Sequence, residues 1–212
     1  MKIKFTENRH QQKKLNFIFI CTIRSLQLGD RIKVAHLVAA PTAENPLNKR
    51  FVYSFSEIIA LPHPHNNILA LFLHIHTENG SSIKLTPYHL IFSRACDSLI
   101  NASTALQLKY ASDVSIGECV QTEHGEERVN VVESIYERGI YSAITAASNS
   151  YLVVNGVVAS PYALNHNKVD AFYDIFRLLY KFLPSAILSS NYFISCYSKF
   201  SYFIVNLSKI MF

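Results

Sequence analysis

Short runs of β-branched and aromatic residues, separated by turn residues at regular intervals, occupy most of the sequence between residues 15 and 160. Valine, isoleucine, threonine, tyrosine and phenylalanine suit a pleated, half-buried strand, whereas glycine, asparagine and aspartate suit turns. The runs predict strands at 31–38, 52–61, 68–77, 82–85, 90–92, 107–110, 129–136, 140–145 and 151–158. Turn residues stand at Gly29-Asp30, Glu78-Asn79-Gly80, Glu123-His124-Gly125 and Asn155-Gly156. Many short strands at even spacing indicate an all-β domain.

An internal repeat supports this interpretation. The stretch 25–32 contains a Gly-Asp pair and is similar to 113–120, which has Gly-Glu at the same place. Farther on, Leu85-Thr86-Pro87-Tyr88-His89 is echoed by Ala159-Ser160-Pro161-Tyr162-Ala163, and each follows a predicted strand. Two copies of one β unit predict a pseudo-twofold all-β body. Chance similarity between short strands is the alternative.

Size and composition fit one globular domain. A chain of 212 residues with 50% hydrophobic and 17% charged residues can bury a single good core. The net charge of +5 is partly local to the first fourteen residues, and no aromatic-basic motif accompanies it, so we expect no nucleic-acid partner. The cysteines are too widely spaced to specify a disulfide framework or a zinc site, which leaves the redox compartment open. They are Cys21, Cys96, Cys119 and Cys196.

After residue 166 the hydrophobic pattern changes to steps of three and four residues, which predicts one amphipathic helix ending near Pro184. The apolar positions are Val169, Phe172, Phe176, Leu179 and Leu183. We expect this helix to pack on the β body, and presenting its apolar face to lipid is the alternative. Polar residues interrupt the tail at 185–212, so no run there is long enough to span a bilayer. Whether the tail forms strands, lies at an interface or stays unfolded is open.

Lys13-Lys14 and the apolar run after them resemble the start of a signal peptide. The run is short, and no small-residue cleavage site follows it. We therefore expect no signal peptide here and interpret the run as the lead into the first strands.

Thr86-Pro87-Tyr88-His89 closes a predicted strand and is the leading candidate for chemistry. A Thr and a His three residues apart put a hydroxyl and an imidazole near one point. Such a pair suits polarising a carbonyl and moving a proton at neutral pH. A purely structural role at a strand end is the alternative.

Four stretches resemble the autoprocessing (Hint) module of hedgehog and hedgehog-related proteins and, more distantly, inteins. They are 25–32 with its Gly-Asp turn, the strand 55–59, the Thr-x-x-His block within 77–90, and the closing strands at 152–163. The likeness is greatest to the warthog and groundhog type. It implies a Hint domain at 22–166 with the duplicated Hint β fold, preceded by an unmatched segment 1–21 and followed by a helix at 167–184 and an apolar tail at 185–212.

The resemblance also implies an activity. In the family, a cysteine at the start of the module attacks the preceding carbonyl, forming a thioester, and a sterol, another lipid alcohol or water then takes the acyl group. By resemblance, His89 donates a proton to the leaving amine and Thr86 polarises the scissile amide. His63 stands where hedgehog proteins have an aspartate that serves the transfer, and it can act as a base. The implied partners are an upstream signalling domain in cis and a lipid alcohol, with no cofactor, a monomeric module and the secretory pathway as location.

The expected nucleophile is missing from its place. Counting back two dozen residues from Gly29 leads to Thr6, and Cys21 lies only eight residues before Gly29. We interpret Cys21 as a small buried hydrophobe. We therefore expect no self-cleavage by this chain, so whether it is an enzyme is open, and a wrong first exon or real loss would both explain the difference. A non-catalytic lipid- or membrane-associated remnant is the alternative function. Pro161 also replaces the cysteine of the family's Ser-Cys-Tyr.

Histidines offer a further hypothesis, because five of them fall within 27 residues and two pairs have the form His-x-His. They are His63, His65, His74, His76 and His89. His74 and His76 alternate along a strand and so share a face, where they could bind zinc or copper. No Cys or Asp at ligand spacing joins them, which favours histidines without a metal, and a metal-binding β module is the weakest of the three options.

Overall fold

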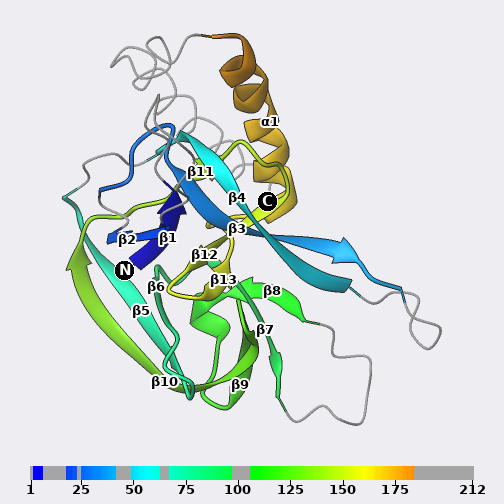
Figure 1. Cartoon of the computed structure of the whole chain (residues 1–212). Coiled ribbons are helices and arrows are strands. Elements are labelled where there is room, and N and C mark those ends of the chain that lie inside the picture. The colour runs from blue at the N-terminus through cyan, green and yellow to red at the C-terminus, as the bar shows by residue number, and fades with distance from the viewer. Residues whose placement is uncertain are drawn as a thin grey trace.

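In the computed structural model, the chain forms a curled β body with one helix packed on it (Figure 1). The structure describes residues 2–6, 18–22, 25–41, 49–62, 67–96 and 106–183. Within these ranges, thirteen strands belong to one continuous sheet. The all-β fold with a single C-terminal amphipathic helix is confirmed.

The elements follow one another along the chain with short connections. They are β1 (Lys2–Thr6), β2 (Ile18–Thr22), β3 (Arg31–Ala39), β4 (Lys49–Ala60), β5 (Leu69–Thr77), β6 (Ser82–Leu85), β7 (Leu90–Ala95), β8 (Gln107–Tyr110), η2 (Ala111–Asp113), β9 (Glu118–Thr122), β10 (Gly125–Arg138), β11 (Ile144–Thr145), β12 (Ser150–Val154), β13 (Val157–Ala159) and α1 (His166–Phe182).

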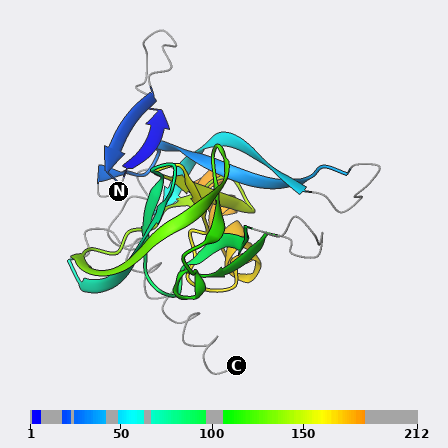
Figure 2. The ribbon, with the colours of Figure 1, turned by 90° about the horizontal axis from the view of Figure 1, so that it is seen from below.

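Two antiparallel hairpins, β3–β4 and β9–β10, organise the sheet. The first runs in register from Arg31 opposite Glu57 to Ala39 opposite Lys49, and its far end projects beyond the rest of the sheet (Figure 2). The hairpins exchange partners, since β4 pairs with β11 from the second half of the chain, and β10 pairs with β5 from the first half. This exchange ties the two halves into one body.

The turns that precede β3 and β9 have the same backbone geometry. Gly29 and Gly117 have φ angles of +90° and +91°, a region where glycine avoids the clash of a Cβ. The acidic residue that follows each glycine accepts a hydrogen bond from a backbone N–H three residues earlier, over 2.9 Å for Asp30 and 3.0 Å for Glu118. The repeat in the sequence therefore corresponds to a repeated structural unit.

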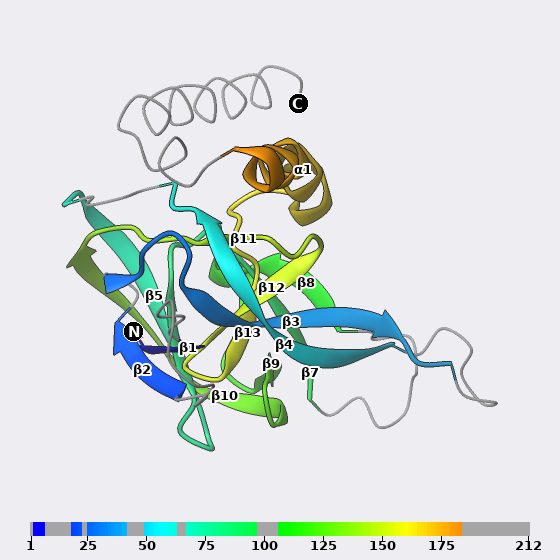
Figure 3. The same ribbon diagram turned by 45° about the horizontal axis from the view of Figure 1, so that its top comes forward.

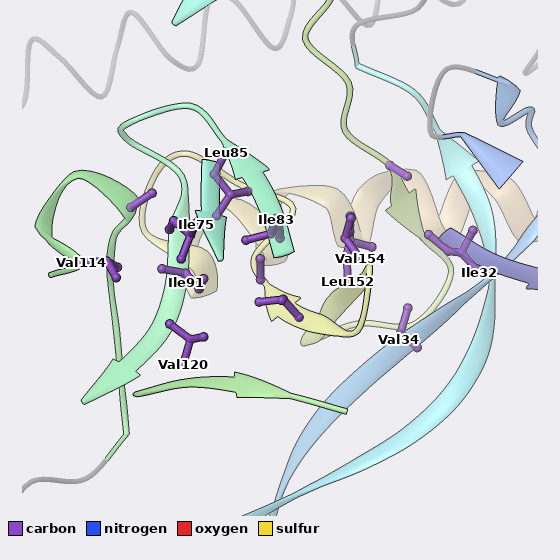
Figure 4. Close-up of a cluster of buried hydrophobic side chains, with 14 of the residues drawn as sticks. Ile32, Val34, Ile75, Ile83, Leu85, Ile91, Val114, Val120, Leu152 and Val154 are labelled. Atoms are coloured by element: carbon purple, nitrogen blue, oxygen red, sulfur yellow. The ribbon is translucent and has the colours of Figure 1, made fainter. Parts of the chain in front are cut away.

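The core lies between the curled faces of the sheet, and β12 crosses its centre. All five residues of β12 are buried, and alternate side chains face opposite clusters. Leu152 and Val154 join the larger cluster with Ile32, Ile75 and other fully buried side chains (Figure 4). Tyr151 and Val153 join a smaller aromatic cluster on the other side.

Helix α1 covers the end of the sheet where β4 and β11 pair (Figure 3). The side chain of Asn165 caps its N-terminus by accepting from the N–H of Lys168. Its inward face packs on Ile59 and Ile144. No helix within the described residues combines the length and apolar character needed to cross a bilayer.

Three details differ from the sequence expectations. The strand predicted at 140–145 is confined to Ile144–Thr145, and the one at 151–158 is two strands separated by Asn155-Gly156, with Asn155 at φ +47°. Cys96 and Cys119 form a disulfide that links the end of β7 to β9. The cysteine spacing did not predict this pair, because the antiparallel pairing of β7 with β9 brings the residues together.

Candidate functional site

Thr86 and His89 lie in the tight turn between β6 and β7, and the structure brings their side chains together. Thr86 Oγ1 and His89 Nδ1 are hydrogen-bonded over 2.6 Å, and both residues are half-buried. The N–H of His89 also donates to the carbonyl of Thr86 over 3.0 Å. A hydroxyl and an imidazole therefore share one partly exposed point at a strand end.

The short helix η2 holds this turn in place. The N–H of Ser112 donates to the carbonyl of Pro87 over 3.0 Å, and the N–H of Ala111 donates to the carbonyl of His89 over 2.8 Å. These backbone bonds fix the direction in which the Thr86 and His89 side chains leave the turn. Tyr88, between them, is 69% exposed.

The echoed segment after β13 carries a second hydroxyl–imidazole pair. Ser160 Oγ and His166 Nδ1 lie 2.9 Å apart, and the N–H of Ser160 donates to the carbonyl of Leu90, next to His89. Unlike the first pair, Ser160 and His166 are each 2% exposed. The sequence repeat indicated Ser160, but it gave no signal for His166, which follows six residues later instead of three.

His166 is held in its neutral form. Burial lowers its pKa to about 4, although the Asp170 carboxylate opposes part of that shift. Its ring stacks on Tyr151 with 4.2 Å between centroids, and its Nε2 is buried without a hydrogen-bond partner. This imidazole therefore contributes packing and one hydrogen bond rather than charge.

A cavity of about 440 Å³ lies beside the second pair. Its lining comes from β7, β8, η2 and the start of α1, namely Leu90, Leu108, Lys109, Tyr110, Asp113, Asn165, His166 and Asn167. Because Leu90 directly follows His89, the cavity borders both hydroxyl–imidazole pairs.

A buried ion pair anchors α1 beside these residues. Arg177 Nη2 donates to Asp170 Oδ1 over 2.6 Å, and Tyr162 Oη donates to the same oxygen over 2.8 Å. Burial by itself would raise the pKa of Asp170, but these donors and the N–H of Asn149 hold it below its ordinary value. Burial and the Asp170 carboxylate raise the pKa of Tyr162.

Two other sequence candidates are less well placed by the structure. His63 lies outside the described residues. Thr6, the residue two dozen positions before Gly29, ends β1 and pairs with Arg31 of β3, and Cys21 lies within β2 opposite Ile3.

The predicted His-x-His pair at His74 and His76 lies on β5, and Glu133 of β10 joins it. Within the described ranges, this is the group of potential ligands whose donor atoms lie close enough together to hold one ion. Sequence reasoning missed Glu133, because only the pairing of β5 with β10 places it beside the histidines.

The family model described as "Hint module" matches residues 14–208 of the chain. Warthog protein 6 of Caenorhabditis elegans is 29% identical over 143 residues, which are 65% of this chain and 21% of that protein. Warthog protein 1 of the same organism is 33% identical over 106 residues, 48% of this chain and 20% of that protein. Indian hedgehog B protein of Danio rerio is 31% identical over 130 residues, 57% and 31% of the two chains.

The chain thus spans about a fifth to a third of the length of these curated relatives. Among solved structures, the VidaL intein (selenomethionine variant) is similar with a TM-score of 0.46 and 14% identity. That match covers 74% of this chain and 89% of the intein.

Proposed function

We propose, from the premise that this chain belongs to the Hint module family and is of hedgehog-related type, that the turn between β6 and β7 is the catalytic centre of an autoprocessing domain. The reaction is an intramolecular N-to-S acyl shift followed by transfer of the acyl group to a lipid alcohol or water. The 2.6 Å contact between Thr86 Oγ1 and His89 Nδ1 is the observation that carries the proposal.

The contact supports a defined division of labour. When Nδ1–H of His89 donates to Thr86 Oγ1, the threonine hydroxyl hydrogen points away from the ring and can donate to the scissile carbonyl oxygen. The protonated imidazole then delivers its Nε2 proton to the amide nitrogen as the carbon–nitrogen bond breaks and the bond to the nucleophile forms. In the second step, His63 is the proposed base that takes the proton of the acceptor.

With Thr6 at the position where the family has cysteine, this chain is proposed not to cleave itself. A hydroxyl at its ordinary pKa is a weak nucleophile compared with a thiol. The activity of the longer relatives, their upstream domains and a location in the secretory pathway come to this chain only as parts of the proposal.

The test restores the thiol. A reporter domain is fused ahead of the full chain carrying Thr6→Cys, and cleavage is followed by gel electrophoresis after addition of dithiothreitol. We expect thiol-dependent cleavage that Thr86→Val and His89→Phe each slow by about 10²-fold. Tyr88→Phe, an exposed position between them, serves as the matched control and should cleave at the unaltered rate.

Folding of each variant is checked by circular dichroism. Cleavage that proceeds equally well in the folded His89→Phe variant contradicts the role of His89. A folded Thr6→Cys fusion that never cleaves contradicts the assignment of position 6.

An exposed apolar stripe on α1 favours a second candidate, binding to a lipid surface without catalysis. Ile175 and Leu178 are 56% exposed and Phe182 is 77% exposed, at helical spacing on one face. Flotation with phosphatidylcholine vesicles compares the full chain with Ile175→Ser/Leu178→Ser/Phe182→Ser. This variant leaves the buried face of the helix intact, so equal partitioning of the two proteins would refute lipid binding through α1.

A further inference from the structure

His74, His76 and Glu133 form a cluster on the pairing of β5 with β10. His74 and His76 are two residues apart on β5 and therefore project from the same face of the sheet. Glu133 lies directly opposite His74 in the register of β10. Because β5 comes from the first half of the chain and β10 from the second, the cluster spans the junction between the two halves.

The three side chains converge on one carboxylate oxygen. Glu133 Oε1 lies 3.2 Å from Nδ1 of His74 and 3.3 Å from Nε2 of His76. The donor atoms all lie within 4.8 Å of one another, and the imidazole centroids are 3.8 Å apart. Two backbones hold this arrangement, so it does not depend on a long flexible side chain from each direction.

These separations match those of ligands on a tetrahedral metal ion. Ligand atoms about 2.1 Å from Zn²⁺ lie about 3.4 Å from each other at tetrahedral angles. Two of the three edges already have that length, and closing the third requires a small rotation of one imidazole. We propose that His74, His76 and Glu133 form a binding site for a divalent transition-metal ion, with Zn²⁺ as the best match to two imidazoles and a carboxylate.

The chemistry of the donors fits the same ion. Metal ligation needs neutral imidazoles, and the pKa of His74 is lowered by burial, with His76 and Lys84 adding to the effect. The exposed fractions rise from 19% for His74 to 35% for His76 and 53% for Glu133, so the ion can enter from solvent. Three protein ligands leave a fourth position for water.

Neighbouring charges make a further prediction possible. Lys84 of β6 lies opposite His74 and forms an ion pair with Glu137. Its positive charge repels a bound cation, although Glu137 offsets part of that repulsion. Removing the ammonium by Lys84→Gln should therefore tighten metal binding, by about two- to fivefold at a partly exposed site.

Calorimetry with ZnCl₂ on the full chain at pH 7.5 tests the site. We expect one ion per chain with micromolar affinity and a rise in melting temperature on adding the metal. The variant His74→Gln/His76→Gln should weaken binding by at least about tenfold, with Glu133→Gln intermediate. His124→Gln, an exposed histidine outside the cluster, is the matched control and should bind as the unaltered chain does.

Two results would overturn the proposal. One is unchanged zinc affinity in the folded His74→Gln/His76→Gln variant, which would show that the cluster consists of hydrogen bonds alone. The other is loss of binding in His63→Gln/His65→Gln instead, which would assign the ion to the other His-x-His pair. Tighter binding by Lys84→Gln supports the site independently, since a damaged fold does not strengthen binding.

Discussion

Protonation of the buried His166 should destabilise the fold in mild acid. This imidazole is 2% exposed, stacks on Tyr151 and has a buried Nε2 without a partner. A proton added at Nε2 would place a charge in a site that offers it no hydrogen bond, with the Asp170 carboxylate as compensation and the Arg177 guanidinium opposing it. In the unfolded chain the same imidazole is hydrated and takes up the proton readily.

The size of the effect follows from the two pKa values. The folded value is about 4, below the ordinary value of about 6.5 expected for the unfolded chain. Because the folded pKa is depressed, the contribution of neutral His166 to stability is complete above pH 6.5 and is lost as the pH falls toward 4. At pH 4.5 the loss amounts to about 2.5 kcal/mol, from about 1.4 kcal/mol for each unit of separation.

Urea denaturation followed by circular dichroism measures this effect at pH 7.5, 6.5, 5.5 and 4.5. The comparison is with His166→Phe, which keeps a ring against Tyr151 but cannot take up a proton. Asp170 and other groups titrate in both proteins, so the difference in unfolding free energy isolates His166. We expect that difference to shift by about 2.5 kcal/mol in favour of the variant between pH 7.5 and 4.5. Parallel pH profiles for the two proteins would refute the reasoning.

Two more predictions concern the contacts that close the fold. Replacing the disulfide by Cys96→Ala/Cys119→Ala should lower the unfolding free energy by about 2–4 kcal/mol, because the bridge closes a loop with a sequence separation of 23. Dithiothreitol should lower the melting temperature of the unaltered chain and leave that of the variant unchanged, whereas equal sensitivity would count against the bridge. Arg177→Met should cost about 3–5 kcal/mol in urea denaturation, because it leaves Asp170 buried without its cation. Lys181→Met, a change of the same type on the exposed part of α1, should cost little, and a similar loss in both variants would contradict the ion-pair argument.

Local features of the structure were predictable from the sequence. Strands at 82–85 and 107–110 have the predicted bounds, because β-branched residues and turn residues act within a few positions of one another. The Thr86–His89 contact was predictable for the same reason, since a turn closes a separation of three residues. The repeated Gly-Asp and Gly-Glu turns were visible because glycine is needed where φ is positive.

Contacts between distant segments were decided by the tertiary structure. Strand pairing places Glu133 beside His74 and joins Cys96 to Cys119, and neither pair shares a local pattern. The packing of α1 on the sheet buries His166 and so sets its pKa. The sequence by itself determined which segments form strands, turns and a helix, because those preferences are local. Which side chains meet depended on register and packing between segments, since burial and electrostatic environment arise only when distant parts of the chain come together.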